Sequence, residues 1–373
     1  FVDVPELLFA EYVYSDDDTK RFLAFQIATL DWMLEWEEKP TTVHCHDHHT
    51  GLIPFMMSQC FNYESLKFIS TVLTIHNAQY QGWFSHSKVH LLPNFDFRNV
   101  GLLDWDGTVN PLAAAIKCAW RVTTVSPSYM EELKDAANGL EALLKHESAK
   151  CVGILNGIDS DVWNPETDTY LLKNYKISSV LSGRKAHKKW LCQEFNLDVD
   201  KPLFAFIGRL VGEKGADLFP KTFDLVLKKS NVSILLLGSG HTSIEEELED
   251  LKHKYPGTYN AFIGYDEKLS HLIYAGCDFL LMPSRVEPCG LNQMYALRYG
   301  AIPIVRSIGG LKDTVVDISE ENGFGICHDE VSIDDMSEAI YRGEMLFSDQ
   351  ITYKRIRKKI MKIDHSWEVS AGE

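Results

Sequence analysis

The sequence has no hydrophobic run long enough to cross a bilayer, since runs such as Phe279 to Met282 and Ile234 to Leu237 extend over only a few residues. No basic and apolar leader opens the chain, so we expect no export. The eight cysteines show no paired spacing, which is typical of free thiols in a reducing compartment. Together these absences predict a cytoplasmic protein that neither spans a membrane nor depends on disulfides.

Positive charge is scarce, because 37 Lys and Arg residues face 53 Asp and Glu residues and the formal net charge is −16 at pH 7. This acidity argues against nucleic acid or an anionic membrane as a bulk partner. Two basic stretches, Arg184 to Lys189 and Lys354 to Lys362, interrupt it. We interpret each as the solvated face of a helix, in preference to a targeting signal or a phosphate site.

The remaining composition is that of a globular protein, with 45% hydrophobic and 24% charged residues in a chain of 373. This length allows two domains of ordinary size, each with its own core. The chain opens with Phe1-Val2-Asp3-Val4, which resembles the end of a strand already under way. We therefore expect a chain that starts inside its first domain, and little or no activity from it.

Short β-branched runs alternate with longer helical patterns along the chain, which predicts βαβ units and parallel sheets covered on both faces. The expected strands are Thr42–Cys45, Phe68–Ile75, Val122–Val125, Val152–Leu155, Leu203–Ile207, Val232–Leu237, Ala261–Ile263, Asp278–Met282, Ile302–Val305 and Gly323–Cys327. The expected helices are Lys20–Glu35, Gly51–Gln59, Pro127–Lys145, Asp217–Lys229, Ser243–Lys254, Leu291–Tyr299 and Ser332–Leu346.

The run of strands is too long for one sheet, and a break falls at residues 156–174, where Asn, Asp, Gly and Pro cluster. A new series begins with the strand Leu203–Ile207. We predict an α/β fold of two Rossmann-like, doubly wound domains that face each other across a cleft, with ligands at the carboxyl ends of the strands. The predicted domains are residues 1–151, with 364–373 returning to them, and residues 152–363.

The first chemical motif is the loop Gly208-Arg209-Leu210-Val211-Gly212-Glu213-Lys214-Gly215, between a predicted strand and a helix. Arg209 offers a planar fork for phosphate oxygens and Lys214 a mobile point charge, so both can converge on one anion. The alternative is a solvated loop with a salt bridge to Glu213. The spacing alone leaves both interpretations open, since it matches no formal phosphate-loop motif.

The second motif follows the strand that ends at Met282, and includes Glu287, Cys289, Gly290, Leu291 and Asn292. We expect a helix to begin at Gly290, and its free N–H groups would form a site for a diphosphate. A carboxylate just before that helix, Glu287, would lie beside the phosphate and over a sugar. The alternative makes Glu287 a capping residue that the helix dipole favours.

The third and fourth motifs lie in the first domain. Four histidines and Asp47 fall within six residues, His44 to His49, but alternation along a strand sends neighbouring side chains to opposite faces. The spacing matches no zinc-ligand pattern, so we favour an active-site strand end that carries Asp47. His76 and Asn77 end the next strand among polar and aromatic residues, which suits a sugar site better than a core.

Seven segments together resemble the bacterial glycogen synthase and plant starch synthase family, in the family's order. They are HCHDHHTGL, TIHNAQYQG, VSPSYM, ILNGID, GRLVGEKG, IGYDE and SRVEPCGLNQMYALRYG, and the resemblance extends from near Phe1 to about Ala371. It implies a GT-B fold and α-1,4-glucan elongation with retention at the anomeric carbon. It also implies no metal and no cofactor, with ADP-glucose or UDP-glucose as donor and a glucan as acceptor.

The resemblance also implies a role for each matching residue. Arg209 and Lys214 would hold the distal phosphates, and His76 and Asp47 would face the anomeric centre and the acceptor. The other expected site residues are Glu287, Cys289 and Gly290 along the glucose, Leu291 and Asn292 beside them, Tyr265 near the base, Asn156 near the interdomain crossover, and Asn77. Fixed cations would stabilise the departing diphosphate in place of magnesium. With no second carboxylate placed as a nucleophile, front-face transfer is expected.

Three departures from the family pattern are visible. The Lys-x-Gly-Gly-Leu motif is absent, the chain ends soon after Trp367, and Asn292 stands where relatives carry Thr. The alternatives are another retaining GT-B glycosyltransferase, a sugar-nucleotide epimerase of similar fold, and a glucan-binding protein without catalysis. A dehydrogenase is the weakest alternative, since Gly238-Ser239-Gly240 matches only part of the dinucleotide-binding fingerprint. The sequence does not decide between ADP-glucose and UDP-glucose.

Overall fold

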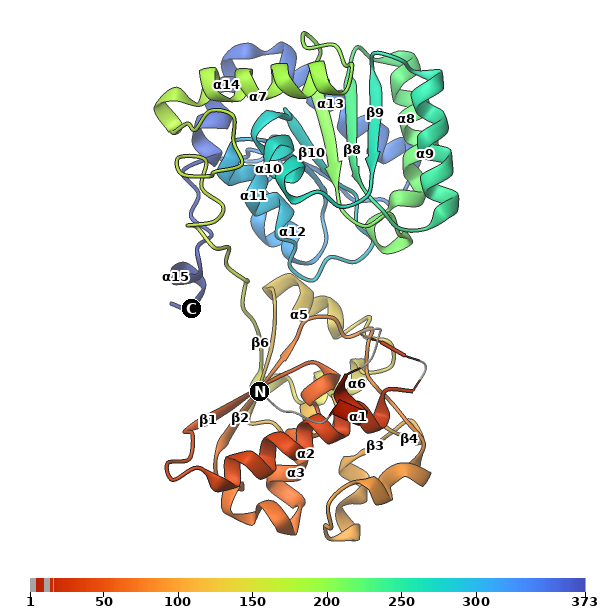
Figure 1. Ribbon diagram of the computed structural model, residues 1–373, viewed down its shortest axis with the longest axis vertical. Helices are drawn as coiled ribbons and strands as arrows, with labels where there is room; N and C mark the ends of the chain where they lie inside the picture. The colour runs from red at the N-terminus through yellow and green to blue at the C-terminus, as the bar shows by residue number, and fades with distance from the viewer. Residues whose placement is uncertain (1–4, 10–13, 16, 373) are drawn as a thin grey trace. The chain divides into compact units, whose positions relative to one another are not determined.

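The computed structural model describes residues 5–9, 14–15 and 17–372 (Figure 1), so the strand expected at Phe1 to Val4 lies outside the described residues. The chain forms two compact units, Phe1–Ile154 and Leu155–Glu373. Residues 364–373 group with the second unit, whereas the sequence placed them with the first. Ile158 accounts for this difference, because its N–H donates to the carbonyl of His365 at 2.8 Å and it pairs with Ser366 in a parallel bridge.

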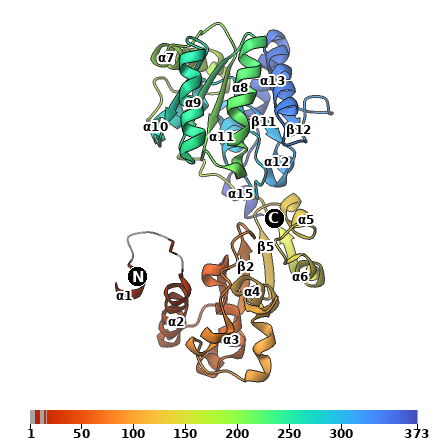
Figure 2. The same cartoon turned by 90° about the vertical axis from the view of Figure 1, so that its right-hand side faces the viewer.

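The first unit is built on a parallel sheet of order β1-β2-β5-β6. Figure 2 shows β2 and β5 with α5 to one side and α2 to the other. The strands are β1 (Thr42–His46), β2 (Ser70–Ile75), β5 (Arg121–Thr124) and β6 (Cys151–Gly153), with a small antiparallel pair β3 (Asp104–Trp105) and β4 (Thr108–Val109). The helices are α1 (Pro5–Leu8), α2 (Thr19–Glu35), α3 (Ile53–Gln59), α4 (Pro111–Cys118), α5 (Pro127–Leu133) and α6 (Glu141–His146).

The second unit is built on a parallel sheet of order β12-β11-β10-β7-β8-β9. Two groups of helices pack among themselves, α8 with α9 and α13, and α7 with α10, α11 and α14. The strands are β7 (Leu203–Ile207), β8 (Ser233–Gly238), β9 (Tyr259–Ile263), β10 (Phe279–Met282), β11 (Ile302–Arg306) and β12 (Ile326–His328). The helices are α7 (Val180–Glu194), α8 (Phe219–Lys229), α9 (Thr242–Lys254), α10 (Glu267–Gly276), α11 (Asn292–Tyr299), α12 (Gly309–Thr314), α13 (Ile333–Ser348), α14 (Gln350–Ile360) and α15 (Trp367–Ser370).

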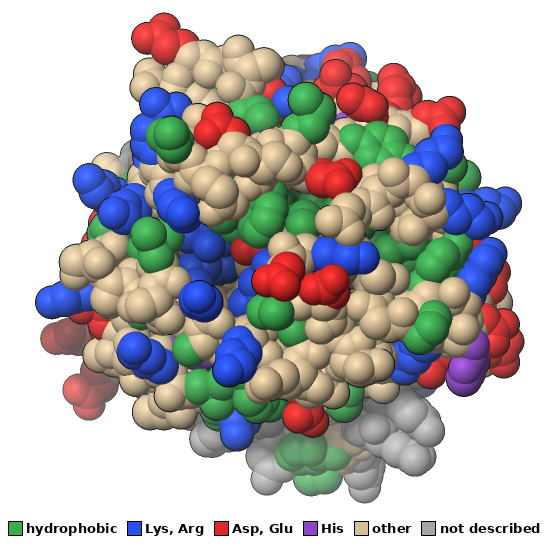
Figure 3. Space-filling view, turned by 90° about the horizontal axis from the view of Figure 1, so that it is seen from above, with side chains coloured by type: hydrophobic (Ala, Val, Ile, Leu, Met, Phe, Trp, Pro, Cys, Tyr) green, Lys and Arg blue, Asp and Glu red, His purple; other side chains and the backbone are tan. Residues whose placement is uncertain are grey.

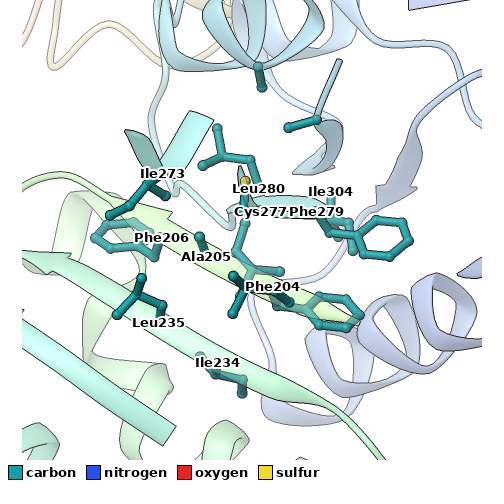
Figure 4. Close-up of a cluster of buried hydrophobic side chains, with 14 of the residues drawn as sticks. Phe204, Ala205, Phe206, Ile234, Leu235, Ile273, Cys277, Phe279, Leu280 and Ile304 are labelled. Carbon is teal, nitrogen blue, oxygen red and sulfur yellow. The ribbon is translucent and has the colours of Figure 1, made fainter. Parts of the chain in front are cut away.

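The core of the second unit explains its continuous apolar strands. Side chains alternate along β7, and the Phe206 ring packs on Phe219 of α8. Phe204 lies on the same face, next to Gly343 of α13, where an added Cβ would fall within 2.9 Å of its ring. Ala205 points to the other face, and Figure 4 shows the side chains of β7 packed among those of β8, β10 and Ile273 of α10. A parallel strand buried on both faces needs apolar residues throughout, as in β8.

All ten predicted strands are present in the two sheets, with ends displaced by up to three residues. The helix predicted over Pro127–Lys145 is wrong, since it divides into α5 and α6. Asn138 and Gly139, between the two helices, adopt positive φ angles of 51° and 96°, so one continuous helix cannot pass through them. The helices α4, α10 and α12 were not predicted. The segments of α4 and α12 are short and apolar or glycine-containing, whereas α10 carries Leu269, Leu272 and Ile273 at helical spacing and was missed.

Both basic stretches lie on helices, α7 and α14, as predicted. The interpretation as solvated faces is wrong for Arg184 and Arg357, which are 1% and 7% exposed. Arg184 donates to three backbone carbonyls, including that of Tyr274 at 2.8 Å, and Arg357 pairs with Asp278 at 3.0 Å. Each guanidinium can be buried because these partners replace water.

Candidate active site

The second unit places two motifs at a topological switch point. The chain passes from β7 outward through β8 and β9, then returns to the other side of β7 with β10. Ligands of open α/β sheets bind where the strand order reverses in this way, outside the carboxyl ends of the strands. The loop after β7 meets the loop after β10 there. A Cβ on Gly215, which has a φ of 71°, would lie 2.5 Å from the carbonyl oxygen of Pro283, so glycine is what allows this close approach.

A lysine and a carboxylate that are 73 residues apart in sequence meet between these loops. Lys214 Nζ lies 2.5 Å from Glu287 Oε2, and Ser284 Oγ donates to the same oxygen at 2.8 Å. The Glu287 side chain is buried at 8% exposure, while Lys214 retains 25%. The buried carboxylate is therefore charge-paired and fixed in place, and the ammonium group still reaches solvent, where it can meet an anionic ligand.

Arg209 forms the salt bridge that the alternative interpretation expected. Its guanidinium lies 3.2 Å from Glu213 Oε2, and its side chain is 65% exposed. An exposed pair of this kind contributes roughly 0–1 kcal/mol, so a phosphate group can compete with Glu213 for the guanidinium. Arg285 holds the loop itself, since it binds both Asp217 and the carbonyl of Gly212.

The start of α11 lies beside this pair. The helix begins at Asn292, and no side chain caps it, so Glu287 does not serve as its cap. Gly290 has φ 71°, and a Cβ there would fall 2.6 Å from Gln293 Oε1, which explains the glycine. Asn292 Nδ2 donates to the carbonyl of Ile207 at 2.8 Å and so ties the helix start to the end of β7. Leu291, immediately before the helix, is exposed.

Cys289 and Asn156 meet behind this helix start. Burial raises the pKa of the Cys289 thiol to about 12, so the group stays neutral, and the nearby backbone of Asn156 opposes this rise. The thiol is therefore a packing group, and any contact of this residue with a ligand must come from its backbone.

Sequence reasoning missed Gly309 and Gly310, which begin α12 after β11. The N–H of Gly310 donates to the carbonyls of Glu287 and Pro288, both at 3.2 Å, and a Cβ on Gly309 would lie 2.1 Å from the Glu287 carbonyl. These glycines let the start of α12 support the backbone of Glu287 directly. A Gly-Gly pair directly after a predicted strand was the signal that could have found them.

Tyr265 lies on the same edge of the sheet, just after β9, and is 85% exposed. The strand β8 separates β9 from β7, so Tyr265 stands apart from the Lys214–Glu287 pair. Asp266 follows it and caps α10 by accepting from the N–H of Leu269 at 2.8 Å. The cap fixes the backbone at this point and leaves the tyrosine ring available for a flat ligand.

The first unit brings Asp47, His76 and Asn77 together, because β1 and β2 are adjacent and parallel. Asp47 Oδ1 accepts from the N–H of His76 at 2.7 Å and from that of Asn77 at 3.4 Å. The backbone of Asp47 has φ 52° and ψ −166°, a conformation that residues other than glycine rarely adopt. The hydrogen bonds that Asp47 accepts from His76 and Asn77 hold the loop after β2 in place.

The histidines of the first unit contact one another and neighbouring polar groups. His46 Nδ1 lies 3.0 Å from His76 Nε2, and His44 Nε2 lies 2.7 Å from Thr74 Oγ1. Burial, reinforced by neighbouring histidines, lowers the pKa of His44 and His46 and that of His48 to about 4. In the part of the chain that the structure describes, no three His, Cys, Asp or Glu side chains are grouped to hold a metal ion. These shifts favour the uncharged imidazole at His44, His46 and His48.

Two further observations bear on the class of protein. Among the described residues, no helix combines the length and apolar character that a bilayer requires. All eight cysteines are free thiols.

Known families match both units. The model of the starch synthase catalytic domain matches residues 1–146, and that of glycosyl transferases group 1 matches residues 188–362. The chain is 51% identical to a glycogen synthase of Flavobacterium johnsoniae over 370 residues, which are 98% of this chain and 78% of that protein. A glycogen synthase of Anoxybacillus flavithermus is 38% identical and is covered over 75% of its length.

Solved structures agree with these matches. The catalytic domain of Starch Synthase IV from Arabidopsis thaliana, bound to ADP and acarbose, has a TM-score of 0.88 and 33% identity, with 98% of this chain and 78% of that chain covered. A sucrose-phosphate synthase from Thermosynechococcus elongatus, at TM-score 0.63 and 18% identity, shares the fold. Two parallel-sheet units of this kind make up the GT-B fold. The chain therefore belongs to the glycogen and starch synthase family and is a glycosyltransferase of that fold.

Proposed function

We propose that this protein transfers glucose from ADP-glucose to the non-reducing end of an α-1,4-glucan, with retention at the anomeric carbon. The observation that carries the proposal is the Lys214–Glu287–Ser284 arrangement at the switch point of a chain 51% identical to a glycogen synthase. ADP is favoured as the nucleotide because the starch synthase at TM-score 0.88 is bound to ADP and acarbose. Eight free thiols are in keeping with action in the cytoplasm.

On the donor side, we assign the departing diphosphate to Arg209, Lys214 and the start of α11. Negative charge builds on the diphosphate as the bond to the anomeric carbon breaks, and cations held beforehand lower that barrier without reorganising. The glucose then lies along Glu287, Cys289 and Gly290. The fixed carboxylate of Glu287 stabilises positive charge on the sugar ring, and Tyr265 packs near the base.

On the acceptor side, we assign His76 and Asp47, with Asn77 beside them. The bond between the anomeric carbon and the diphosphate oxygen breaks, and the acceptor hydroxyl oxygen bonds to that carbon from the same face. The hydroxyl proton passes to the departing diphosphate, so no covalent enzyme intermediate is needed. Asp47 acts here by holding the N–H groups of His76 and Asn77, which positions the imidazole.

A metal ion or cofactor has no role in this proposal. Arg209 and Lys214 supply the positive charge that magnesium provides in other glycosyltransferases, and the imidazoles of the first unit are available to hydrogen-bond a sugar.

The test is the rate of glucose transfer to glycogen by the full-length protein from each of two donors under identical conditions. We expect kcat/KM to be higher with ADP-glucose than with UDP-glucose, and NMR of the new linkage to show the α configuration. A higher kcat/KM with UDP-glucose would overturn the choice of nucleotide. Glycogen binding without transfer from either donor would instead identify a glucan-binding protein without catalysis.

A further inference from the structure

The two basic stretches of the sequence line one cavity in the second unit. The cavity has a volume of about 900 Å³ and lies between residues of α7 and α14. Six of the residues that line it are basic and two, Asp200 and Asp278, are acidic, in a chain with a formal charge of −16. The basic residues are Arg184, Lys185, Lys188, Lys189, Lys354 and Arg357. Positive charge is thus concentrated against the trend of the whole protein.

The floor of the cavity holds more positive than negative charge. Asp278 is paired with Lys188 at 2.7 Å and with Arg357 at 3.0 Å, so one carboxylate faces two cations. Arg184 is 1% exposed, and its partners are backbone carbonyls, which bring no negative charge. Its Nε is also buried and has no hydrogen-bond partner among the described residues. A buried cation without a counter-ion is costly, and an anion would relieve it.

The rim adds three lysines. Lys185, Lys189 and Lys354 are exposed, and none of them forms an ion pair or hydrogen bond with another residue in the described part of the chain. Figure 3, which looks onto the end of the second unit that carries α7 and α14, shows Lys and Arg side chains gathered around a hollow. Ammonium groups that line one hollow repel each other, and this repulsion falls when an anion binds.

The uncharged part of the lining is mixed: Leu181, Leu197, Val199, Phe347 and the ring of Tyr353 form an apolar wall, and Gln193, Asn196 and Gln350 add polar side chains. A volume of about 900 Å³ lies within the roughly 300–1,000 Å³ typical of small-molecule sites, which combine apolar walls with a few placed charges. Inorganic phosphate alone would leave these walls uncovered. The lining therefore fits a molecule with both a phosphate group and a less polar body.

This cavity is separate from the candidate active site. Asp278 directly precedes β10, and residues 196–200 precede β7, so the cavity lies at the amino ends of these strands. Lys214 and Glu287 lie beyond their carboxyl ends. The diphosphate of a sugar nucleotide held by Lys214 therefore cannot reach this cavity. We propose that the cavity is a second ligand site, and that it binds a small organic phosphate.

The test uses the full chain, isothermal titration calorimetry, and phenyl phosphate and inorganic phosphate as probes. We expect phenyl phosphate to bind more tightly, because its ring covers the apolar wall. The triple variant Lys185→Glu, Lys189→Glu, Lys354→Glu should weaken phenyl phosphate binding about 10-fold or more, as expected for lost charge-assisted bonds. The matched control is Arg355→Glu, Lys358→Glu, Lys362→Glu, which makes the same change in net charge at exposed positions outside the cavity and should bind as wild type.

Both triple variants keep Arg209 and Lys214, so a loss confined to the first one reports on the cavity and not on the active site. Equal weakening in the two variants would show unspecific attraction and overturn the proposal. So would the absence of phenyl phosphate binding to the wild type, or equal affinity for the two probes. If the Glu triple variant fails to fold, Lys185→Gln, Lys189→Gln, Lys354→Gln removes the charge without reversing it and must show the same selective loss.

Discussion

Replacement of Glu287 by Gln separates the chemical step from binding. The Glu287 carboxylate accepts hydrogen bonds from Lys214 at 2.5 Å and Ser284 at 2.8 Å, and its side chain is 8% exposed. Gln has the same volume, and its oxygen still accepts both bonds, so the loop after β10 should keep its shape. Because the hydrogen bonds to Gln lack charge assistance, the free energy of unfolding should fall by about 1 kcal/mol, which lowers Tm by about 2–4 °C.

The effect on turnover should be much larger. Two unit charges about 4 Å apart attract by about 4 kcal/mol at an effective dielectric of about 20. Because the transition state carries part of a full positive charge, we expect a loss of about 2–4 kcal/mol, or about 30- to 1,000-fold in kcat. The Kd for ADP should stay the same or fall, because Lys214 loses the carboxylate that neutralises it.

The assay is initial rates of transfer from ADP-glucose to glycogen, with the Kd for ADP measured by calorimetry on the same protein. Glu213→Gln is the matched control, since it makes the same chemical change on the loop after β7, where Glu213 pairs with Arg209. It should change kcat less than about threefold, as for an exposed pair. Equal losses of kcat and ADP affinity in Glu287→Gln would refute the reasoning and make Glu287 a binding residue.

Four further outcomes are expected. Arg209→Ala and Lys214→Ala should each lower kcat/KM for the donor by about 10- to 150-fold, the loss of one charge-assisted bond, and unchanged values in both would remove them from the phosphate site. Gly290→Ala should destabilise the protein by about 1–3 kcal/mol in urea unfolding, because φ is 71° and the Cβ meets Gln293; Gly257→Ala, at φ 83° with open space around it, should cost less. His48 has a folded pKa of about 4 against an ordinary value of 6.5, so the unfolded chain binds more protons between these values and stability falls as the pH drops from 6.5 towards 4. His48→Gln should flatten the dependence of stability on pH. If the urea midpoint of the variant changes with pH as that of the wild type does, the assignment of this pKa to His48 is contradicted. Dialysis against EDTA should leave transfer activity intact, and stoichiometric zinc with activity lost to the chelator would overturn the metal-free proposal.

Local chemistry was enough to predict the strands and the loops that follow them. Buried parallel strands must be apolar, so segments such as Leu203–Ile207 are visible in the sequence, and loops after them collect glycine and charged residues. The motifs around Arg209, Lys214, Glu287, Asp47 and His76 were found for this reason. Their order also carried the resemblance to glycogen and starch synthases, which the 51% identity confirms.

Contacts between distant segments were decided only by the tertiary structure. Lys214 meets Glu287 only because β7 and β10 are neighbours in the sheet. The order of strands in a sheet cannot be predicted from the local hydrophobic pattern of each strand. The same holds for Gly310, which supports the Glu287 backbone from another strand end. Burial of Arg184 was likewise hidden, because a basic stretch looks solvated until the carbonyls that satisfy its guanidinium are brought to it by folding. The sequence by itself determined the strands, most of the longer helices and the family, since these depend on local apolar patterns and on the order of short motifs along the chain. The pairing of charges across the sheet, and the cavity between α7 and α14, required the fold, since they depend on residues about 70 or more positions apart.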